Sequence, residues 1–278
     1  MRRFETAHRL GEGTRDVSRP KKSSFQRRTL IFSCALTAAA AVSGASARPL
    51  TAPAITHRLH LRAGSPGAAQ QSTNWAGWVA SNGGYNHVRV TYRVPTVTTT
   101  SDDRYSATWA GIGGDGSPDL IQAGTGQDSV GGAPAYYAWT EILPETEHRI
   151  LGFAVSPGNV ITIDIRQTTL DRWVIVVTNS TTNHSFTRKT AYPSSHFTAE
   201  WIHEAPTVDG LQANLAKTSN VIFDGGTANG RTIANAGGVD TIEMFKGSTR
   251  IATPGPLDSD GDGFAVADGS AAPPAPSS

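Results

Sequence analysis

Cysteine is almost absent from this 278-residue chain, and its one cysteine, Cys34, lies in an N-terminal apolar run rich in alanine. The remainder therefore has no thiol that could form a disulfide, act as a nucleophile or bind zinc. The motifs G-x-S-x-G and H-E-x-x-H are also missing, which removes the sequence anchors of serine hydrolases and zincins. Only 17% of the residues are charged, so few carboxylates are available for the ion pairs that acid disrupts.

Positive charge is concentrated at the N-terminus. Residues 1–47 hold nine Lys/Arg and three Asp/Glu, whereas the remainder holds 15 basic and 20 acidic residues. An acidic body argues against nucleic-acid binding. Arg27-Arg28 ends a basic stretch, an apolar run reaches Val42, and Ala45-Ser46-Ala47 supplies a small-residue cleavage site. We predict a cleavable signal over 1–47 and a secreted, monomeric protein without a membrane anchor, and both Sec and twin-arginine export remain open.

Composition divides the rest of the chain. Residues 48–70 are rich in Ala, Pro and Gly and form either a removable pro-segment or a linker. Residues 71–268 consist of short β-type runs between Gly, Pro, Asn and Asp clusters, and we expect one folded domain there. The tail 269–278 is rich in Pro, Ala and Ser, which predicts disorder.

Twelve runs in the central region have strand character. Ile161, Ile163 and Ile165 alternate with polar residues, as on a half-buried strand. The one helix candidate, 210–217, is weak. The expected strands lie near 74–80, 88–94, 107–112, 119–124, 135–142, 160–166, 173–178, 185–188, 197–204, 220–223, 241–245 and 263–266. Many short strands with almost no helix predict an all-β sandwich or barrel.

Two motifs suggest metal binding but have simpler interpretations. His196 and His203 are seven residues apart, so they point to opposite faces of a straight strand, and we expect packing or surface histidines. The series Asp258 to Gly263 resembles the start of a calcium loop, but Gly269 stands at the twelfth position, where a Glu ligand is required. We therefore expect a turn into the last strand, with no metal and no cofactor.

Three polar side chains lie in the middle of predicted strands. Strand alternation places Gln122 with Leu120 and Gly124, and Glu200 with Ile202, while Glu141 shares a face with Trp139. Mid-strand positions of a sandwich are usually apolar, so these residues form either a solvated sheet face or a site. The residues alone leave both interpretations open.

The blocks around these residues resemble the glutamic peptidases, the eqolisin family. That family carries W-x-G-I, L-Q-x-G, Y-x-A-W-x-E-x-x-P and A-E-W-I-x-E in this order. The matching segments are Trp109 to Ile112, Ile121 to Gly124, Tyr136 to Pro144 and Ala199 to Glu204, and the similarity runs from about Ser72 to Ala267. It implies a concanavalin-A-like sandwich of two curved antiparallel sheets with a concave substrate cleft.

The resemblance also implies a Glu/Gln dyad for acid-acting, pepstatin-insensitive endopeptidase chemistry on polypeptide substrates. It assigns the dyad to Glu200 and Gln122 and a supporting role to Glu141. Trp75, Trp109 and Trp139 are candidates for an aromatic substrate-binding wall or for plain core. Gly113 stands where fungal members have Asp, so Asp115 is a candidate replacement. The missing disulfide cysteines are typical of the prokaryotic branch.

Within that resemblance, the dyad has a simple chemical interpretation. A glutamate with a pKa near ~4.3 is partly ionised at acid pH, so it acts as base and then as acid. The neutral amide of Gln122 would donate to the oxyanion. The alternatives are a carbohydrate-binding module, which predicts exposed aromatic faces, and a glycosidase using Glu141 and Glu200, which leaves Gln122 without a role.

Overall fold

The computed structural model describes residues 52–62 and 69–278, so the predicted export signal lies outside it. This part of the chain is almost entirely β-structure, with one short 3₁₀ helix, Ile233–Asn235. Within it, no helix is long and apolar enough to cross a membrane. The strands are β1 Ile55–Thr56, β2 Gln70–Ser72, β3 Trp75–Ala80, β4 His87–Arg93, β5 Ala107–Gly113, β6 Leu120–Val130, β7 Ala133–Ile142, β8 His148–Arg149, β9 Val160–Thr169, β10 Arg172–Asn179, β11 His184–Ala191, β12 Ala199–Glu204, β13 Thr207–Val208, β14 Leu211–Gln212, β15 Val221–Ala228, β16 Arg231–Thr232, β17 Val239–Lys246, β18 Thr249–Pro254 and β19 Phe264–Asp268.

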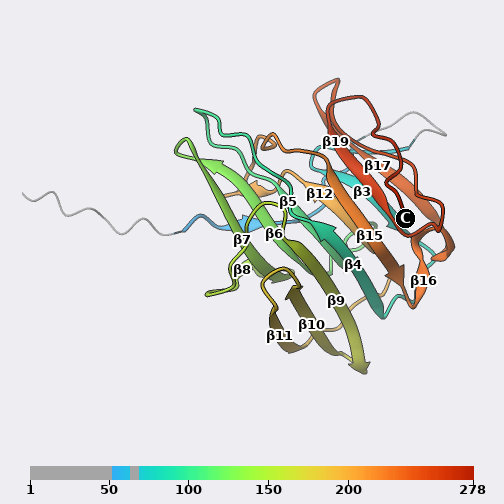
Figure 1. Ribbon diagram of the computed structural model, residues 1–278. Helices are drawn as coiled ribbons and strands as arrows, with labels where there is room; N and C mark the ends of the chain where they lie inside the picture. The colour runs from blue at the N-terminus through green and yellow to red at the C-terminus, as the bar shows by residue number, and fades with distance from the viewer. Residues whose placement is uncertain (1–51, 63–68) are drawn as a thin grey trace, which may run out of the picture. The chain divides into compact units, whose positions relative to one another are not determined.

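These strands build two layers, and their pairing is antiparallel except between β2 and β17. Along one continuous ladder the order is β11-β10-β9-β4-β15-β19-β18-β17-β3-β12-β5-β6-β7-β8. Figure 1 shows β9, β4 and β15 in front of β5, β12 and β3. β18 pairs with β17 in one layer and leads through β19 to β15 in the other. The structure confirms the predicted all-β sandwich.

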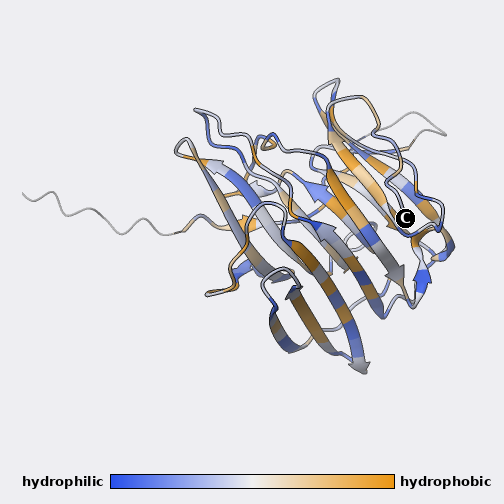
Figure 2. Cartoon of the chain, viewed as in Figure 1, coloured by the Kyte–Doolittle hydropathy of each residue, from blue (hydrophilic) through white to orange (hydrophobic). Residues whose placement is uncertain are grey.

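The core between the layers follows from strand alternation. Ile161, Ile163 and Ile165 of β9 are completely buried, whereas Thr162 and Asp164 between them are partly exposed. The strands accordingly carry both hydrophobic and hydrophilic residues along their length (Figure 2). These isoleucines belong to the same apolar cluster as Trp201 of β12, which lies in the opposite layer. Burying such side chains is the main favourable term for this fold.

A second apolar cluster covers the other face of β3, β12, β5, β6 and β7. It contains the following buried residues: Trp75, Val79, Ala107, Trp109, Leu120, Trp139, Leu143, Ile202 and Ile242. Because Trp201 points into the sandwich core, Glu200 and Ile202 point to this other face. We call it the site face.

A third, small sheet contains the N-terminal segment. β1 pairs with β13, and β13 pairs with β14, all antiparallel. At the start of β1, Ala54 donates its backbone N–H to Oδ1 of Asp209 and accepts the backbone N–H of Asp209 at its carbonyl. Glu147 donates its backbone N–H to the carbonyl of Ile55 at 2.9 Å. Residues 52–62 are therefore an ordered part of this structure.

The predicted helix at 210–217 is wrong. Strand β14 takes up Leu211–Gln212, and the chain then runs alongside two distant loops. Tyr105 donates its N–H to the carbonyl of Asn214, and Thr98 donates to Lys217. These long-range backbone bonds satisfy the groups that a helix would pair internally.

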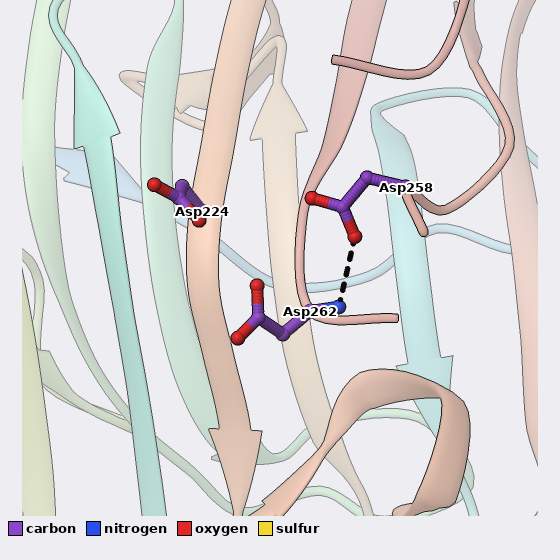
Figure 3. Close-up of side chains that lie close together, drawn as sticks. All are labelled: Asp224, Asp258 and Asp262. Carbon is purple, nitrogen blue, oxygen red and sulfur yellow. Dashed lines mark hydrogen bonds between the residues drawn. The ribbon is translucent and has the colours of Figure 1, made fainter. Parts of the chain in front are cut away.

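The aspartate-rich series before β19 forms the expected turn. One carboxylate oxygen of Asp258 accepts the N–H groups of Gly261, Asp262 and Gly263 at 3.0–3.1 Å. Figure 3 shows Asp258 and Asp262 converging with Asp224 of β15, and oxygens of the three lie within 4.8 Å of one another. The side chain of Asp258 thus adds to the backbone hydrogen bonds that Asp258 makes with Gly261 and Gly263 at this turn.

The tail 269–278 contains no strand or helix. Pro273 is buried, and its backbone lies directly beside Gly255. Disorder of this tail in solution stays a prediction.

Candidate active site

The three polar residues singled out by sequence lie in one row across the site face. In the pairing register Glu200 of β12 lies opposite Gly111 of β5, Gly111 opposite Gln122 of β6, and Gln122 opposite Glu141 of β7. Directly opposed residues point to the same face of a sheet. The register therefore brings Glu200, Gln122 and Glu141 together from segments far apart in the sequence.

Gly111 leaves the space between Glu200 and Gln122 open. A Cβ atom at position 111 would lie 3.0 Å from the Cβ of Gln122 and 3.0 Å from a methyl carbon of Leu120. The two flanking side chains therefore extend over the glycine without a side chain between them. A water or a peptide carbonyl placed above Gly111 would be in reach of both.

Several buried polar atoms on the site face lack a hydrogen-bond partner in the described part of the chain. Both carboxylate oxygens of Glu200, Oε1 of Gln122 and Oε1 of Glu141 have no hydrogen-bond partner among the described residues. The three side chains are 0% exposed. Buried polar groups are normally hydrogen-bonded, and exceptions mark places where water or ligand belongs.

Burial raises the pKa of the Glu200 carboxyl well above its ordinary value, and the charges of Asp115 and Asp119 act in the same direction. Burial likewise raises the pKa of Glu141 to about 8, and the charge of His57 only partly opposes this. Burial therefore favours the neutral form of both carboxyls in this arrangement.

His57 of the N-terminal segment occupies the Gln122 side of the row. Its backbone N–H donates to Oε2 of Glu141 at 3.2 Å, and its carbonyl accepts from Nε2 of Gln122 at 3.4 Å. The same Nε2 also donates to Oε2 of Glu141. The amide that sequence analysis assigns to an oxyanion thus already binds a peptide carbonyl.

The His57 ring lies among acidic and aromatic side chains. It stacks on Trp139 with ring centroids 3.9 Å apart, and its nitrogens meet Oε2 of Glu204 at 3.0 Å and Oε2 of Glu147 at 3.2 Å. Burial alone would lower its pKa, but these carboxylates, with a smaller effect of Glu141, raise the pKa well above the ordinary value. The surrounding carboxylates therefore favour the imidazolium form of His57.

All three candidate tryptophans lie in the apolar cluster of the site face. Trp75, Trp109 and Trp139 are 0% exposed. Trp109 donates its indole N–H to Glu204 at 2.7 Å, whereas the indole N–H groups of Trp75 and Trp139 have no partner in the described chain. In this state no aromatic face of the three is open to solvent.

Asp115 lies near Glu200, as its effect on the pKa of Glu200 shows. It is 7% exposed and accepts a hydrogen bond from Nε2 of Gln70 at 3.0 Å. Gly113 has φ = +92°, and a Cβ there would lie 2.5 Å from the carbonyl oxygen of Asp119. This backbone excludes an aspartate at position 113, so the nearby carboxylates come from Asp115 and Asp119.

Sequence reasoning missed His57, Glu204 and Glu147 as parts of this site. Glu204 lies four residues beyond Glu200 on β12 and on the same face, which strand alternation could have shown. His57 and Glu147 gave no such signal, because the first lies in an Ala/Pro-rich segment and the second in the turn between β7 and β8.

The two histidines considered as metal ligands have separate surroundings. His203 is buried beside Thr108, and burial lowers its pKa to about 4. His196 stacks on Trp173 and bonds to the carbonyl of Tyr85.

A surface hollow of about 310 Å³ lies elsewhere, bounded by Arg104, Lys246 and Arg250, and includes neither Gln122 nor Glu200. Residues 52–62 occupy the Gln122 end of the candidate site.

Comparison with known proteins decides the family. The family model described as "Peptidase A4 family" matches residues 73–261, more than half of the chain. The chain belongs to the peptidase A4 family. Aspergillopepsin-2 of Aspergillus niger is 26% identical over 159 residues, which cover 49% of this chain and 56% of that protein. The chain thus spans little more than half the length of this curated relative.

Solved structures share the fold of this family member. Scytalido-glutamic peptidase with a transition-state analogue inhibitor has a TM-score of 0.60 at 18% identity, over 70% of this chain and 98% of that chain. Aspergilloglutamic peptidase from Aspergillus niger has a TM-score of 0.51 at 21% identity, over 59% and 99%. The β-sandwich of this peptidase A4 member is therefore the fold of glutamic peptidases.

Proposed function

We propose that this protein is a secreted, acid-acting, glutamic-type endopeptidase with Glu200 and Gln122 as its catalytic residues. Family membership supports the reaction class. The observation that carries the residue assignment is the register Glu200–Gly111–Gln122, with buried oxygens on both side chains that have no hydrogen-bond partner among residues 52–62 and 69–278. No cofactor or metal is needed for the proposed chemistry.

In the proposed reaction, removal of the segment 48–70 admits water to the row, and this hydration lowers the pKa that burial has raised at Glu200. Ionised Glu200 then takes a proton from a water molecule above Gly111. That water attacks the scissile carbonyl, and Nε2 of Gln122 donates to the resulting oxyanion. The C–N bond then breaks as Glu200 returns the proton to the departing amine. Glu141, which accepts the Gln122 amide, holds that amide in position.

We propose that the segment 48–70 is a removable pro-segment rather than a linker. In this arrangement His57 binds both Glu141 and Gln122 through its backbone. Asn74 further holds the segment by donating to the carbonyl of Arg58 and accepting from the N–H of His60. A substrate carbonyl would have to displace these contacts to reach Gln122.

Two other functions are less well supported. A carbohydrate-binding module needs exposed aromatic faces, whereas Trp75, Trp109 and Trp139 are buried here. A glycosidase would use Glu141 and Glu200, but these lie three strands apart, roughly 14 Å between backbones. It would also leave Gln122 between them without a role.

The decisive experiment compares the full chain with its Glu200→Gln variant. Each is secreted and incubated with a denatured protein substrate from pH 2 to 7 in the presence of pepstatin. We expect cleavage by the wild type in the acid range and none by Glu200→Gln. Glu145→Gln, at an exposed loop position, is the control and should cleave normally.

Circular dichroism must show that the Glu200→Gln protein is folded. A folded, inert wild type at every pH would overturn the peptidase proposal. Sequencing the N-terminus of the active species tests the pro-segment, since we expect His57 to be absent from it. An active species that retains His57 would contradict the pro-segment.

A further inference from the structure

We propose that the pocket around His57 is a substrate side-chain subsite selective for planar cations, the side chains of His and Arg. This subsite proposal rests on the proposed peptidase function and adds the class of substrate that the enzyme would prefer. The His57 pocket is defined by Glu204, Glu147, Trp139 and Glu141. Its ligand would be the residue whose carbonyl oxygen faces Gln122, which is the residue before the scissile bond.

The position of the pocket follows from the backbone of His57. The carbonyl of His57 accepts from Nε2 of Gln122, the group proposed to hold the scissile carbonyl. Its N–H donates to Glu141, and the preceding residues Ile55–Thr56 are extended in β1. The segment therefore lies along the site as an extended peptide, and the His57 side chain occupies the pocket next to the reacting carbonyl.

The charges that line the His57 pocket favour a side chain with one positive charge. Glu204 and Glu147 each place a carboxylate oxygen within 3.2 Å of a ring nitrogen of His57. Arg149 pairs with Glu147 at 3.1 Å and compensates one of these charges. Glu141 is neutral below its pKa of about 8. A neutral occupant would leave a buried carboxylate unpaired, which is costly.

The shape of the His57 pocket favours a planar side chain. The imidazole and the Trp139 indole are only 4° from parallel, with centroids 3.9 Å apart. A guanidinium is planar, stacks on aromatic faces and donates to two carboxylates at once, whereas an ammonium does not stack. His57 is only 1% exposed, so water cannot replace the contacts of its side chain. Both the charge and the planar shape of the bound side chain therefore affect binding.

The first experiment measures docking of the segment without catalysis. Full chains with His57, His57→Arg or His57→Phe are made in a Glu200→Gln background, which prevents self-cleavage. Amide hydrogen exchange of residues 54–60 reports docking. We expect protection with His57 and with His57→Arg, and exchange about ten- to a hundredfold faster with His57→Phe, since hydrogen bonds to charged groups are lost.

Two carboxylate variants sharpen this experiment. Glu147→Gln should speed exchange of residues 54–60, whereas Glu145→Gln, in the same loop but without contact to His57, should not. Glu204 also holds Trp109 and Asn74, so its substitution is less specific. Equal protection with Phe and His would show a merely apolar pocket and would overturn the proposal.

The second experiment measures cleavage by the mature enzyme. Peptides differ only at the residue before the scissile bond, which is His, Arg, Lys or Phe. We expect kcat/KM to favour His and Arg over Phe by at least about tenfold, and Glu147→Gln to reduce this ratio while Glu145→Gln keeps it. Cleavage without this preference would refute the subsite and leave the peptidase intact. Absence of all cleavage would refute the peptidase, and hydrogen exchange would still decide the pocket.

Discussion

Gly111 is the residue on which the geometry of the candidate dyad depends. Strands β12 and β6 are not neighbours, because β5 runs between them. Any side chain at position 111 would separate Glu200 from Gln122, and a Cβ atom alone would come within 3.0 Å of Gln122. The absence of a side chain there lets two residues from non-adjacent strands act on one substrate group.

Replacing Gln122 tests its role as an oxyanion donor. We expect Gln122→Ala to lower kcat about 10²–10³-fold, the usual loss for one such donor, with a smaller change in KM. Gln167→Ala, on β9 of the other layer, is the matched control and should keep kcat. Steady-state kinetics at acid pH make the comparison. A kcat within threefold of wild type for Gln122→Ala would show that Gln122 is not a donor in the transition state.

The raised pKa of Glu141 has a consequence for stability. In the unfolded chain this carboxyl titrates at its ordinary value, but in the folded chain it ionises only near pH 8. Between these values the unfolded state binds fewer protons, so the free energy of unfolding falls as pH rises. Glu141→Gln mimics the neutral form and removes this loss.

We therefore expect Glu141→Gln to match wild type in stability at pH 4.5 and to exceed it at pH 8. Urea unfolding midpoints of the full chain at the two pH values provide the measurement. A variant that is equally destabilised at both would show that Glu141 is ionised in the folded protein.

At the scale of elements, two short pieces outside the main ladder have the clearest consequences. β1 brings His57 onto the site face by pairing with β13. The turn before β19 depends on one side chain, because Oδ1 of Asp258 accepts three backbone N–H groups. The pairing of β1 with β13 joins residues far apart in the sequence, whereas the Asp258 turn orders its own neighbours.

Asp258→Ala should lower the free energy of unfolding by about 1–3 kcal/mol, since buried N–H groups lose their acceptor. Asp258→Asn keeps an acceptor oxygen and removes one of three neighbouring negative charges, so we expect it to stay close to wild type. Thermal unfolding with circular dichroism distinguishes the two. Equal destabilisation by Ala and Asn would mean that charge, rather than hydrogen bonding, stabilises the turn.

At the scale of the whole molecule, buried carboxyls favour the folded state at acid pH. Burial raises the pKa values of Asp128 to about 7 and of Asp268 to about 6, as it does for Glu141 and Glu200. These groups stay protonated when folded but ionise when unfolded, so each costs stability as pH rises. His203 acts oppositely, because its lowered pKa makes protonation below about pH 6.5 favour the unfolded chain.

The four carboxyls, together with His57, whose raised pKa acts in the same direction, outweigh His203, so the free energy of unfolding should increase as pH falls from 7.5 to 5. Urea titrations of the full chain at half-unit pH intervals measure this trend. Most proteins are most stable between about pH 5 and 8, so a maximum at or below pH 5 would be distinctive. A maximum at neutral pH would contradict the buried, neutral carboxyls.

The sequence alone determined the strands and the faces of their residues, because a period of two is a local property. Ile161, Ile163 and Ile165 were placed correctly in the core, and Gln122, Glu141 and Glu200 on the right face of their strands. The family motifs likewise depend only on residue order, and the match over 73–261 agrees with them.

Only the tertiary structure decided which residues meet. The pairing register places Glu200, Gly111 and Gln122 in one row, and register is a relation between strands that no single strand encodes. The helix expected at 210–217 failed for the same reason, since distant backbone groups took its hydrogen bonds. His57 could not be found at all from its neighbours, because its charge and position depend on Glu204 and Glu147, more than 85 residues away.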